Sequence, residues 1–142
     1  MLKRVCVLVL LLTAVACSGS STAPSTTTGT LAPSNSVTSY PVTLNAAGVI
    51  TVSVTSVTPS LAPNVPLRFF IGVPNASSAC TDDASDDLWL VGSGSTCIGG
   101  LHCTTSTIPA SVKRTASTGS FCVGVENVTN TSETYTLTIT AG

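Results

Sequence analysis

Apolar and hydroxyl-bearing side chains alternate along several stretches of this 142-residue chain, and this alternation limits the available folds most strongly. In residues 50–55, isoleucine or valine occupies every second position and threonine or serine the positions between. A two-residue period places one kind of side chain on each face of a β-strand. The period returns at residues 67–73. No segment carries the three-to-four-residue apolar period of a helix, so the chain is predicted to be all-β.

The C-terminal part predicts a hairpin. Residues 121–125 and 135–139 both place large apolar side chains at alternate positions, and the polar residues 127–133 separate them. Two neighbouring alternating segments joined by a polar turn are typical of antiparallel strands with one buried and one wetted face.

Shorter segments complete the expected strands. Residues 88–91 form an apolar run in which Trp89 is expected to belong to the core, and residues 59–66 contain three prolines, which indicate a loop. Residues 106–115 predict a strand at a sheet edge, because Pro109 lacks a backbone donor. Strands about ten residues apart with turn signals between them predict a small antiparallel β-sandwich.

The first sixteen residues have the order of a signal peptide. Lys3 and Arg4 precede an apolar run over residues 5–16. As a helix this run would be about 18 Å long, too short for the ~30 Å hydrocarbon core of a bilayer. Residues 1–16 are therefore predicted to be cleaved, and the mature chain to be exported.

The expected cleavage point resembles the lipobox of bacterial lipoprotein signal peptides. That motif is a triplet of small or aliphatic residues followed by cysteine, and Ala14-Val15-Ala16-Cys17 fits it, with Ala14 where the family most often has leucine. The resemblance implies a diacylglycerol on Cys17, palmitate-type acylation and anchoring in the bacterial cell envelope, since two or three acyl chains hold a protein on a bilayer. Ser18 implies, by the same analogy, the outer membrane, facing periplasm or surface. The alternative is a secreted protein cut by ordinary signal peptidase.

Residues 17–39 are predicted to be a lipid-anchored, disordered linker, and residues 40–142 the β-sandwich domain. The linker is rich in Ser, Thr and Pro and has almost no large apolar residue, so burial cannot offset its ordering entropy. As a flexible coil it would span about 25 Å. The mature chain has three basic and six acidic side chains, a net charge of −3. Without a basic stripe, nucleic acid is not an expected partner, and the domain is expected to be a monomer.

Four cysteines remain after the leader and Cys17 are set aside. An even number in a small exported domain predicts two disulfides, for which three connectivities are open. The alternative is a zinc site that uses Cys97, His102 and Cys103 with one further cysteine, but no Cys-x-x-Cys spacing is present and an oxidising compartment favours disulfides. The four cysteines that remain after the leader and Cys17 are Cys80, Cys97, Cys103 and Cys122.

Residues 40–141 resemble the bacterial pre-peptidase C-terminal domain and related lipoprotein domains. The likeness rests on residues 44–54 (LNAAGVITVSV), 119–127 (GSFCVGVEN) and 135–139 (YTLTI). It implies a jelly-roll-like sandwich with an accessory, non-catalytic role, although the hydrolase that such domains usually accompany has no room in this chain. It also implies a disulfide Cys80–Cys122, which leaves the local pair Cys97–Cys103.

Two groups of residues are candidates for chemistry. Four aspartates follow Cys80 and could ligate Ca²⁺ through oxygen, but their spacing does not match an EF-hand loop, and a solvated acidic loop is the usual explanation of such a cluster. His102 would be the base of any Ser–His or Cys–His pair, but no Gly-x-Ser-x-Gly motif accompanies it, so no catalytic residue is expected. Asn75, Asn127 and Asn130 are interpreted as turn residues. The four aspartates that are candidates for Ca²⁺ binding are Asp82, Asp83, Asp86 and Asp87.

These observations favour an envelope lipoprotein whose sandwich is a non-catalytic binding or accessory module for protein or polysaccharide. A purely structural lipoprotein without a specific ligand and, less favoured, a small hydrolase are the alternatives. Trp89 with Phe70 could form an aromatic platform for such a ligand. No cofactor is expected beyond the lipid on Cys17.

Overall fold

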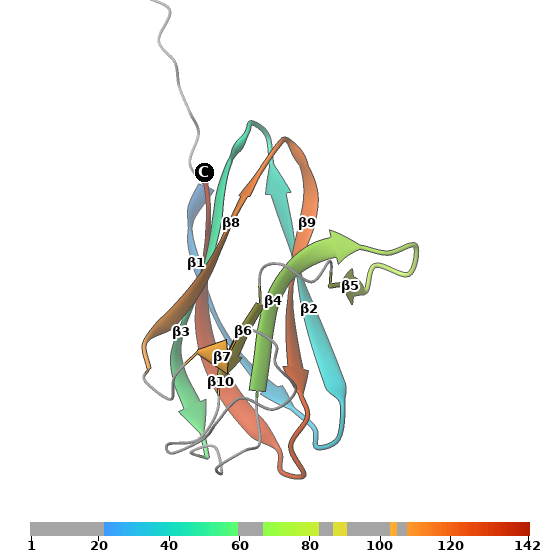
Figure 1. Ribbon diagram of the computed structural model, residues 1–142, viewed down its shortest axis with the longest axis vertical. Coiled ribbons are helices and arrows are strands. Elements are labelled where there is room, and N and C mark those ends of the chain that lie inside the picture. Colours follow the sequence, from blue (N-terminus) through green and yellow to red (C-terminus); the bar gives the residue numbers. More distant parts are fainter. Residues whose placement is uncertain (1–21, 60–66, 83–86, 91–102, 105–107) are drawn as a thin grey trace, which may run out of the picture.

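The computed structural model describes residues 22–59, 67–82, 87–90, 103–104 and 108–142. Within these ranges the chain forms strands and no helix, which confirms the all-β prediction (Figure 1). No described residue lies in a helix that could span a membrane. The strands are β1 (Thr22–Leu31), β2 (Ser36–Leu44), β3 (Gly48–Thr58), β4 (Leu67–Pro74), β5 (Cys80–Thr81), β6 (Asp87–Leu90), β7 (Cys103–Thr104), β8 (Ala110–Ala116), β9 (Gly119–Asn127) and β10 (Glu133–Ala141).

The strands form two sheets that pack face to face, as in a β-sandwich. The first has the order β1-β10-β3-β8, and the second has the order β2-β9-β4-β6-β7, with β5 added beside β4. Neighbours are antiparallel in every described pairing except the short β6–β7 pair. The predicted strand after Pro109 is β8, and it lies at an edge of the first sheet as expected.

The core lies between the sheets and follows from the alternation in the sequence. The inward positions of β3 are fully buried, and those of β4 face them from the second sheet. Phe69 meets Tyr135 edge to face, with ring centroids 5.9 Å apart. Aromatic pairs prefer this geometry over a stacked sandwich. The buried apolar side chains of β3 and β4 are Ile50, Val52, Val54, Leu67, Phe69 and Ile71.

The predicted C-terminal hairpin is wrong in its pairing, although both of its strands exist. β9 pairs with β2 and β4, whereas β10 pairs with β1 and β3 in the other sheet. Residues 128–132 therefore cross from one sheet to the other. Asn127 holds this crossing, because its Nδ2 donates to the carbonyls of Ala32 (2.9 Å) and Thr131 (2.8 Å). Alternation shows that a strand has an apolar face; it does not show which strand lies beside it.

The prediction of a disordered linker is wrong for residues 22–39. This segment contains β1 and the start of β2, so the domain begins before Tyr40. β1 pairs with β10 along its length, and Leu31 is buried. A composition rich in threonine misled the prediction, because threonine favours strands as well as polar linkers. Residues 17–21 lie outside the described part of the chain.

Candidate functional site

A strap, residues 75–82, covers part of the outer face of the second sheet. Its turn is held by Asn75, whose Oδ1 accepts the N–H groups of Ser77 (2.9 Å) and Ala79 (3.0 Å). This confirms Asn75 as a turn residue. The strap then returns over β4 at Gly72, where a Cβ atom would overlap the carbonyl oxygen of Thr81. A glycine is therefore needed here for close approach of two backbones.

The strap is joined to the sheet by the disulfide that the resemblance implied. Cys80 is bonded to Cys122 on β9, with Cα atoms 5.5 Å apart. The Cys80 N–H also donates to Ser39 Oγ on β2 at 3.0 Å. The strap thus contacts strands that are far apart in the sequence, and Cys122 becomes buried although its position faces away from the main core.

Arg68 gathers two residues of the predicted calcium loop. Its guanidinium pairs with Asp82, with Asp87 at 3.1 Å and with Glu126 at 3.3 Å. The Asp87 side chain is 4% exposed. All three carboxylates share this one cation. The described geometry therefore gives Asp82 and Asp87 a structural role; Asp83 and Asp86 lie outside it.

Trp89 belongs to the same cluster and is not a core residue, which corrects the expectation. Its Nε1 donates to Asp87 Oδ2 at 2.8 Å, and the Arg68 guanidinium carbon lies 5.1 Å from its ring and 4.8 Å from that of Phe70. The neighbouring Leu88 takes the inward position instead. Arg68 thus occupies the space between the two rings, so they do not form an open platform.

Cys97 and His102 lie outside the described residues. The pair Cys97–Cys103, the alternative zinc site and any role of His102 therefore stay predictions.

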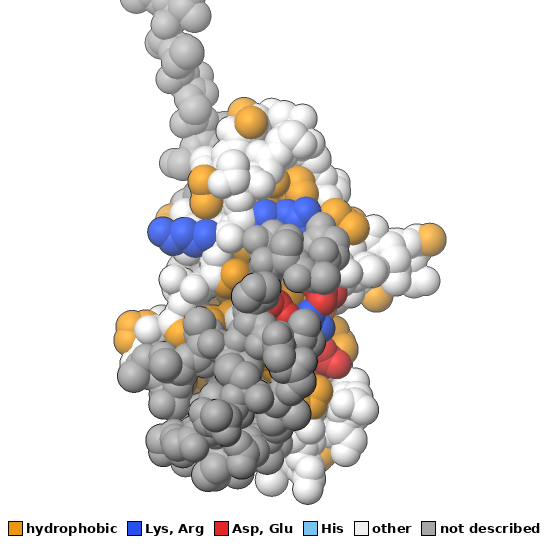
Figure 2. All heavy atoms as spheres, viewed as in Figure 1, with side chains coloured by type: hydrophobic (Ala, Val, Ile, Leu, Met, Phe, Trp, Pro, Cys, Tyr) orange, Lys and Arg blue, Asp and Glu red, His pale blue; other side chains and the backbone are white. Residues whose placement is uncertain are grey.

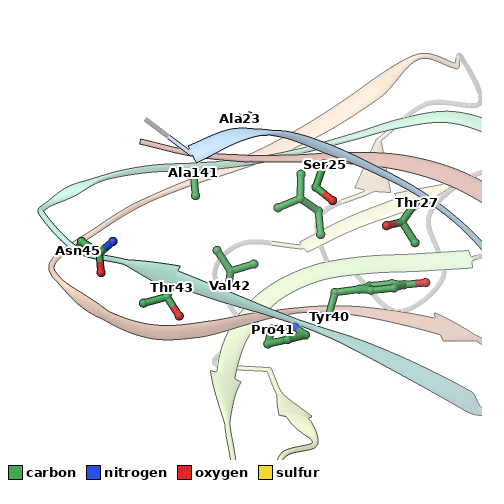
Figure 3. Close-up of a pocket in the computed structure, with 10 residues that line it drawn as sticks. Ala23, Ser25, Thr27, Tyr40, Pro41, Val42, Thr43, Asn45 and Ala141 are labelled. Atoms are coloured by element: carbon green, nitrogen blue, oxygen red, sulfur yellow. The ribbon is translucent and has the colours of Figure 1, made fainter. Parts of the chain in front are cut away.

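A groove of about 450 Å³ opens between β1 and β2, the edge strands on one side of the sandwich. Figure 3 shows Val42 on β2 and Ala141 on β10 pointing toward each other, with Ser25 and Thr27 projecting from β1. The side chains of β1 that line the groove, Ala23, Ser25 and Thr27, are too small to fill the space there. The groove is lined by Ala23, Ser25, Thr27, Tyr40, Pro41, Val42, Thr43, Asn45, Ile139 and Ala141.

The lining of the groove is neutral. None of these ten residues is charged; Ser25, Thr27, Thr43 and Asn45 offer hydrogen-bonding groups, and the rest are aliphatic side chains and the aromatic Tyr40. Such a surface suits a neutral ligand with both hydroxyl groups and apolar faces.

A pair of tyrosines holds one wall of the groove. The hydroxyls of Tyr40 and Tyr135 are 2.6 Å apart. Burial, together with this bond, raises the pKa of the Tyr135 phenol above its ordinary range. Gly29 stands opposite Tyr135 on β1, and a Cβ atom there would overlap both phenol groups. Tyr40 is therefore fixed by a neutral buried partner.

Both edge strands that border the groove carry a proline. Pro24 lies in β1, where the pairing with β10 shifts between Thr22 and Ser25, and Pro41 lies in β2. Proline and register shifts at sheet edges hinder the addition of another strand. The groove is consequently poorly suited to binding an extended peptide through its backbone.

No family model matches the chain, and no curated protein matches it.

The sequence reasoning missed the groove. Ser25 and Thr27 fell in the predicted linker, and Tyr40 and Ile139 are separated by most of the domain. The one available signal was threonine at every second position (26, 28 and 30) in a segment that ends at the apolar Leu31.

Proposed function

We propose that this chain is an exported bacterial lipoprotein, held on the cell envelope by lipid on Cys17, whose sandwich is a non-catalytic binding module for a neutral polysaccharide. The observation that carries the binding role is the uncharged groove between β1 and β2. The resemblance of residues 40–141 to the pre-peptidase C-terminal domain supports an accessory role without catalysis.

Both the size and the chemistry of the groove favour a sugar. A volume of about 450 Å³ lies within the ~300–1,000 Å³ typical of small-ligand sites. Sugar rings present hydroxyl groups at their edges and apolar C–H groups on their faces. Ser25, Thr27 and Asn45 would bond to the former, and Val42 and Ile139 would pack against the latter. The prolines of β1 and β2 weigh against a peptide ligand.

Adjacent threonines on β1 provide a matched test. Thr27 lines the groove, whereas the exposed Thr28 pairs with Thr136 on the outer face. Thr27→Trp would fill the groove and should weaken binding of neutral hexose and N-acetylhexosamine oligosaccharides about tenfold or more, equivalent to ~1.4 kcal/mol. Thr28→Trp should leave binding unchanged. Titration calorimetry measures both, with circular dichroism to confirm folding.

The outcome also separates the rival functions. Equal binding by both variants would place the ligand elsewhere, and binding of an envelope protein instead of sugar would change the ligand class. If no ligand binds the wild type, a purely structural lipoprotein becomes the better account. A hydrolytic activity lost on changing His102 would favour an enzyme.

The lipid anchor has a test of its own. Cells grown with labelled palmitate should label the wild type but not Cys17→Ser, and only the wild type should fractionate with membranes. An unlabelled wild type together with a membrane-bound Cys17→Ser would overturn the anchor.

The finer features of the fold belong to the same proposal. We expect the jelly-roll-like arrangement of the related domains and a second disulfide, Cys97–Cys103. Non-reducing peptide mapping should recover the fragments that contain these two cysteines as one linked species. Two free thiols there would contradict the pairing.

A further inference from the structure

We propose that one end of the sandwich rests against the phospholipid surface, so that the domain is held in a single orientation rather than suspended on a flexible tether. This inference rests on the proposed lipid anchor at Cys17. We call this end the anchor end. It comprises Thr22 and residues 44–48, 116–119 and 141–142.

The strand register brings these segments together. Thr22 stands opposite Ala141, which stands opposite Ile50, and Gly48 stands opposite Ala116. In the other sheet, Leu44 stands opposite Gly119. The start of β1, the β2–β3 turn, the β8–β9 turn and the C-terminus therefore lie at one end of the molecule (Figure 1).

The chain between Cys17 and β1 is short. Only residues 18–21 separate them, and a chain of this length spans at most about 18 Å when fully extended. The predicted linker of residues 17–39 would have allowed the domain to turn freely. With β1 in the sheet, the anchor end stays next to the bilayer, while the opposite end lies roughly 25–30 Å away along the strands.

Charge is distributed along the same axis. Lys113 and Arg114 stand opposite Thr51 and Ile50, near the anchor end; Lys113 is exposed, whereas Arg114 donates to the Ile71 carbonyl and lies over the Phe121 ring. Glu126, which pairs with Arg68, stands opposite Val37, and the buried Glu133 stands opposite Leu31, toward the far end, where β1 ends and β2 begins. Figure 2 shows basic side chains on the part of the visible face nearer the C-terminus and, beyond them, acidic side chains with a basic one between them.

The remaining carboxylates follow the same division. Asp82 and Asp87 pair with Arg68, whose neighbour in the sheet is Glu126. The anchor end itself carries no charged side chain, and Lys113 and Arg114 lie on β8, the strand that leads into it. An anionic lipid surface attracts the anchor end and repels the far end.

The surface of the anchor end suits contact without insertion. Residues 45–47 and 117–118 are exposed and have small or uncharged side chains. Asn45 and Ala141 also line the groove, so the groove lies beside the anchor end. Small side chains let the backbone approach lipid headgroups closely, and no large apolar side chain is available in these turns to enter the hydrocarbon. The inferred partner is therefore the headgroup layer.

Energy transfer from a new tryptophan to a dansyl-phosphatidylethanolamine tests the orientation. The mature lipidated protein would be placed in phosphatidylethanolamine–phosphatidylglycerol vesicles, with Trp89, the chain's only tryptophan, as the constant background. Ala46→Trp adds a donor at the anchor end, and Asn130→Trp adds one at the far end. We expect transfer from the first to exceed that from the second about twofold or more, since roughly 25 Å separates them along the strands.

The outcomes distinguish the orientation from the anchor. Equal transfer from the two variants, with the protein still floating with vesicles, overturns the orientation alone. A wild type that does not float with vesicles overturns both proposals. Insertion of about twenty Gly/Ser residues between Ser21 and Thr22 should make the energy-transfer efficiencies of the two tryptophan variants similar, because a flexible coil of that length lets the domain turn. An unchanged difference would refute the role of the short connection.

Discussion

The two sheets share one core, but their outer faces are built on different principles. On the first sheet, three threonine pairs link β1 and β10, with hydroxyl oxygens 3.0–3.1 Å apart, and all of them are exposed. On the second sheet, the strap, a disulfide and the Arg68 cluster cover the surface. The three threonine pairs on the first sheet are Thr26–Thr138, Thr28–Thr136 and Thr30–Thr134.

The difference comes from what each face presents to water. Threonine hydroxyls need no protein partner, because water replaces a lost bond at an exposed site. The second face carries Phe70 and Cys122, both nearly inaccessible, and Asp87, whose Oδ1 is buried without a partner among the described residues. Groups of this kind depend on neighbours that exclude water and balance charge. Single substitutions on the outer face of the first sheet should therefore change the stability little. On the outer face of the second sheet, a single substitution should weaken the whole set of contacts that cover it.

The largest contrast should come from the disulfide. Replacing Cys80 and Cys122 by Ala should lower the free energy of unfolding by about 4 kcal/mol in the chain-entropy model, for a sequence separation of 42. The matched double change Thr26→Ala with Thr138→Ala crosses β1 and β10 and should lower it by less than about 1 kcal/mol. Urea unfolding measures both. Similar losses would remove the distinction between the faces.

Arg68 should come next. Arg68→Met leaves three carboxylates without their cation, and we expect a loss of about 2–3 kcal/mol, below the full value for a buried pair because Asp82 and Glu126 are about a quarter exposed. Lys113→Met, at an exposed position of the first sheet, should change stability by less than about 0.5 kcal/mol. Thermal unfolding at low and high salt is the measurement. A loss in the Lys113 variant as large as in the Arg68 variant would contradict the comparison.

Gly72 tests whether the strap is coupled to the sheet. Gly72→Ala forces the strap away from β4, and overpacking of this kind lowers stability by about 1–3 kcal/mol. In the variant that lacks Cys80 and Cys122 the strap can move, so the same change should have a smaller effect. A double-mutant cycle gives the coupling directly. Full additivity would show that the disulfide does not hold the strap.

The smallest effect is expected at Thr28. Thr28→Val removes one hydroxyl pair but keeps the β-branched shape, so the change in unfolding free energy should stay within about 0.5 kcal/mol. A loss above ~1 kcal/mol would mean that the threonine rows act cooperatively, as the Arg68 cluster does. Urea unfolding against the wild type decides between these results.

The local character of the chain was readable from the sequence. Alternation at residues 50–55 and 67–73 predicted β3 and β4, and Pro109 predicted an edge strand. These predictions are confirmed because a two-residue period and a missing backbone N–H group are local properties of the strand that carries them. Export and lipidation at Cys17 stay predictions, since they depend on residues that the structure does not describe.

Tertiary structure alone decided which strands became neighbours. The segments 119–127 and 133–141 looked like one hairpin, yet they belong to opposite sheets, because their apolar faces are buried best when they face each other. β1 became a strand only because β10 offered it a ladder, and its small side chains then left the groove beside β2. Trp89 turned outward to Arg68 because Leu88 took the inward position. In each case the deciding contact joins residues far apart in the chain, and a local pattern carries no information about such a partner.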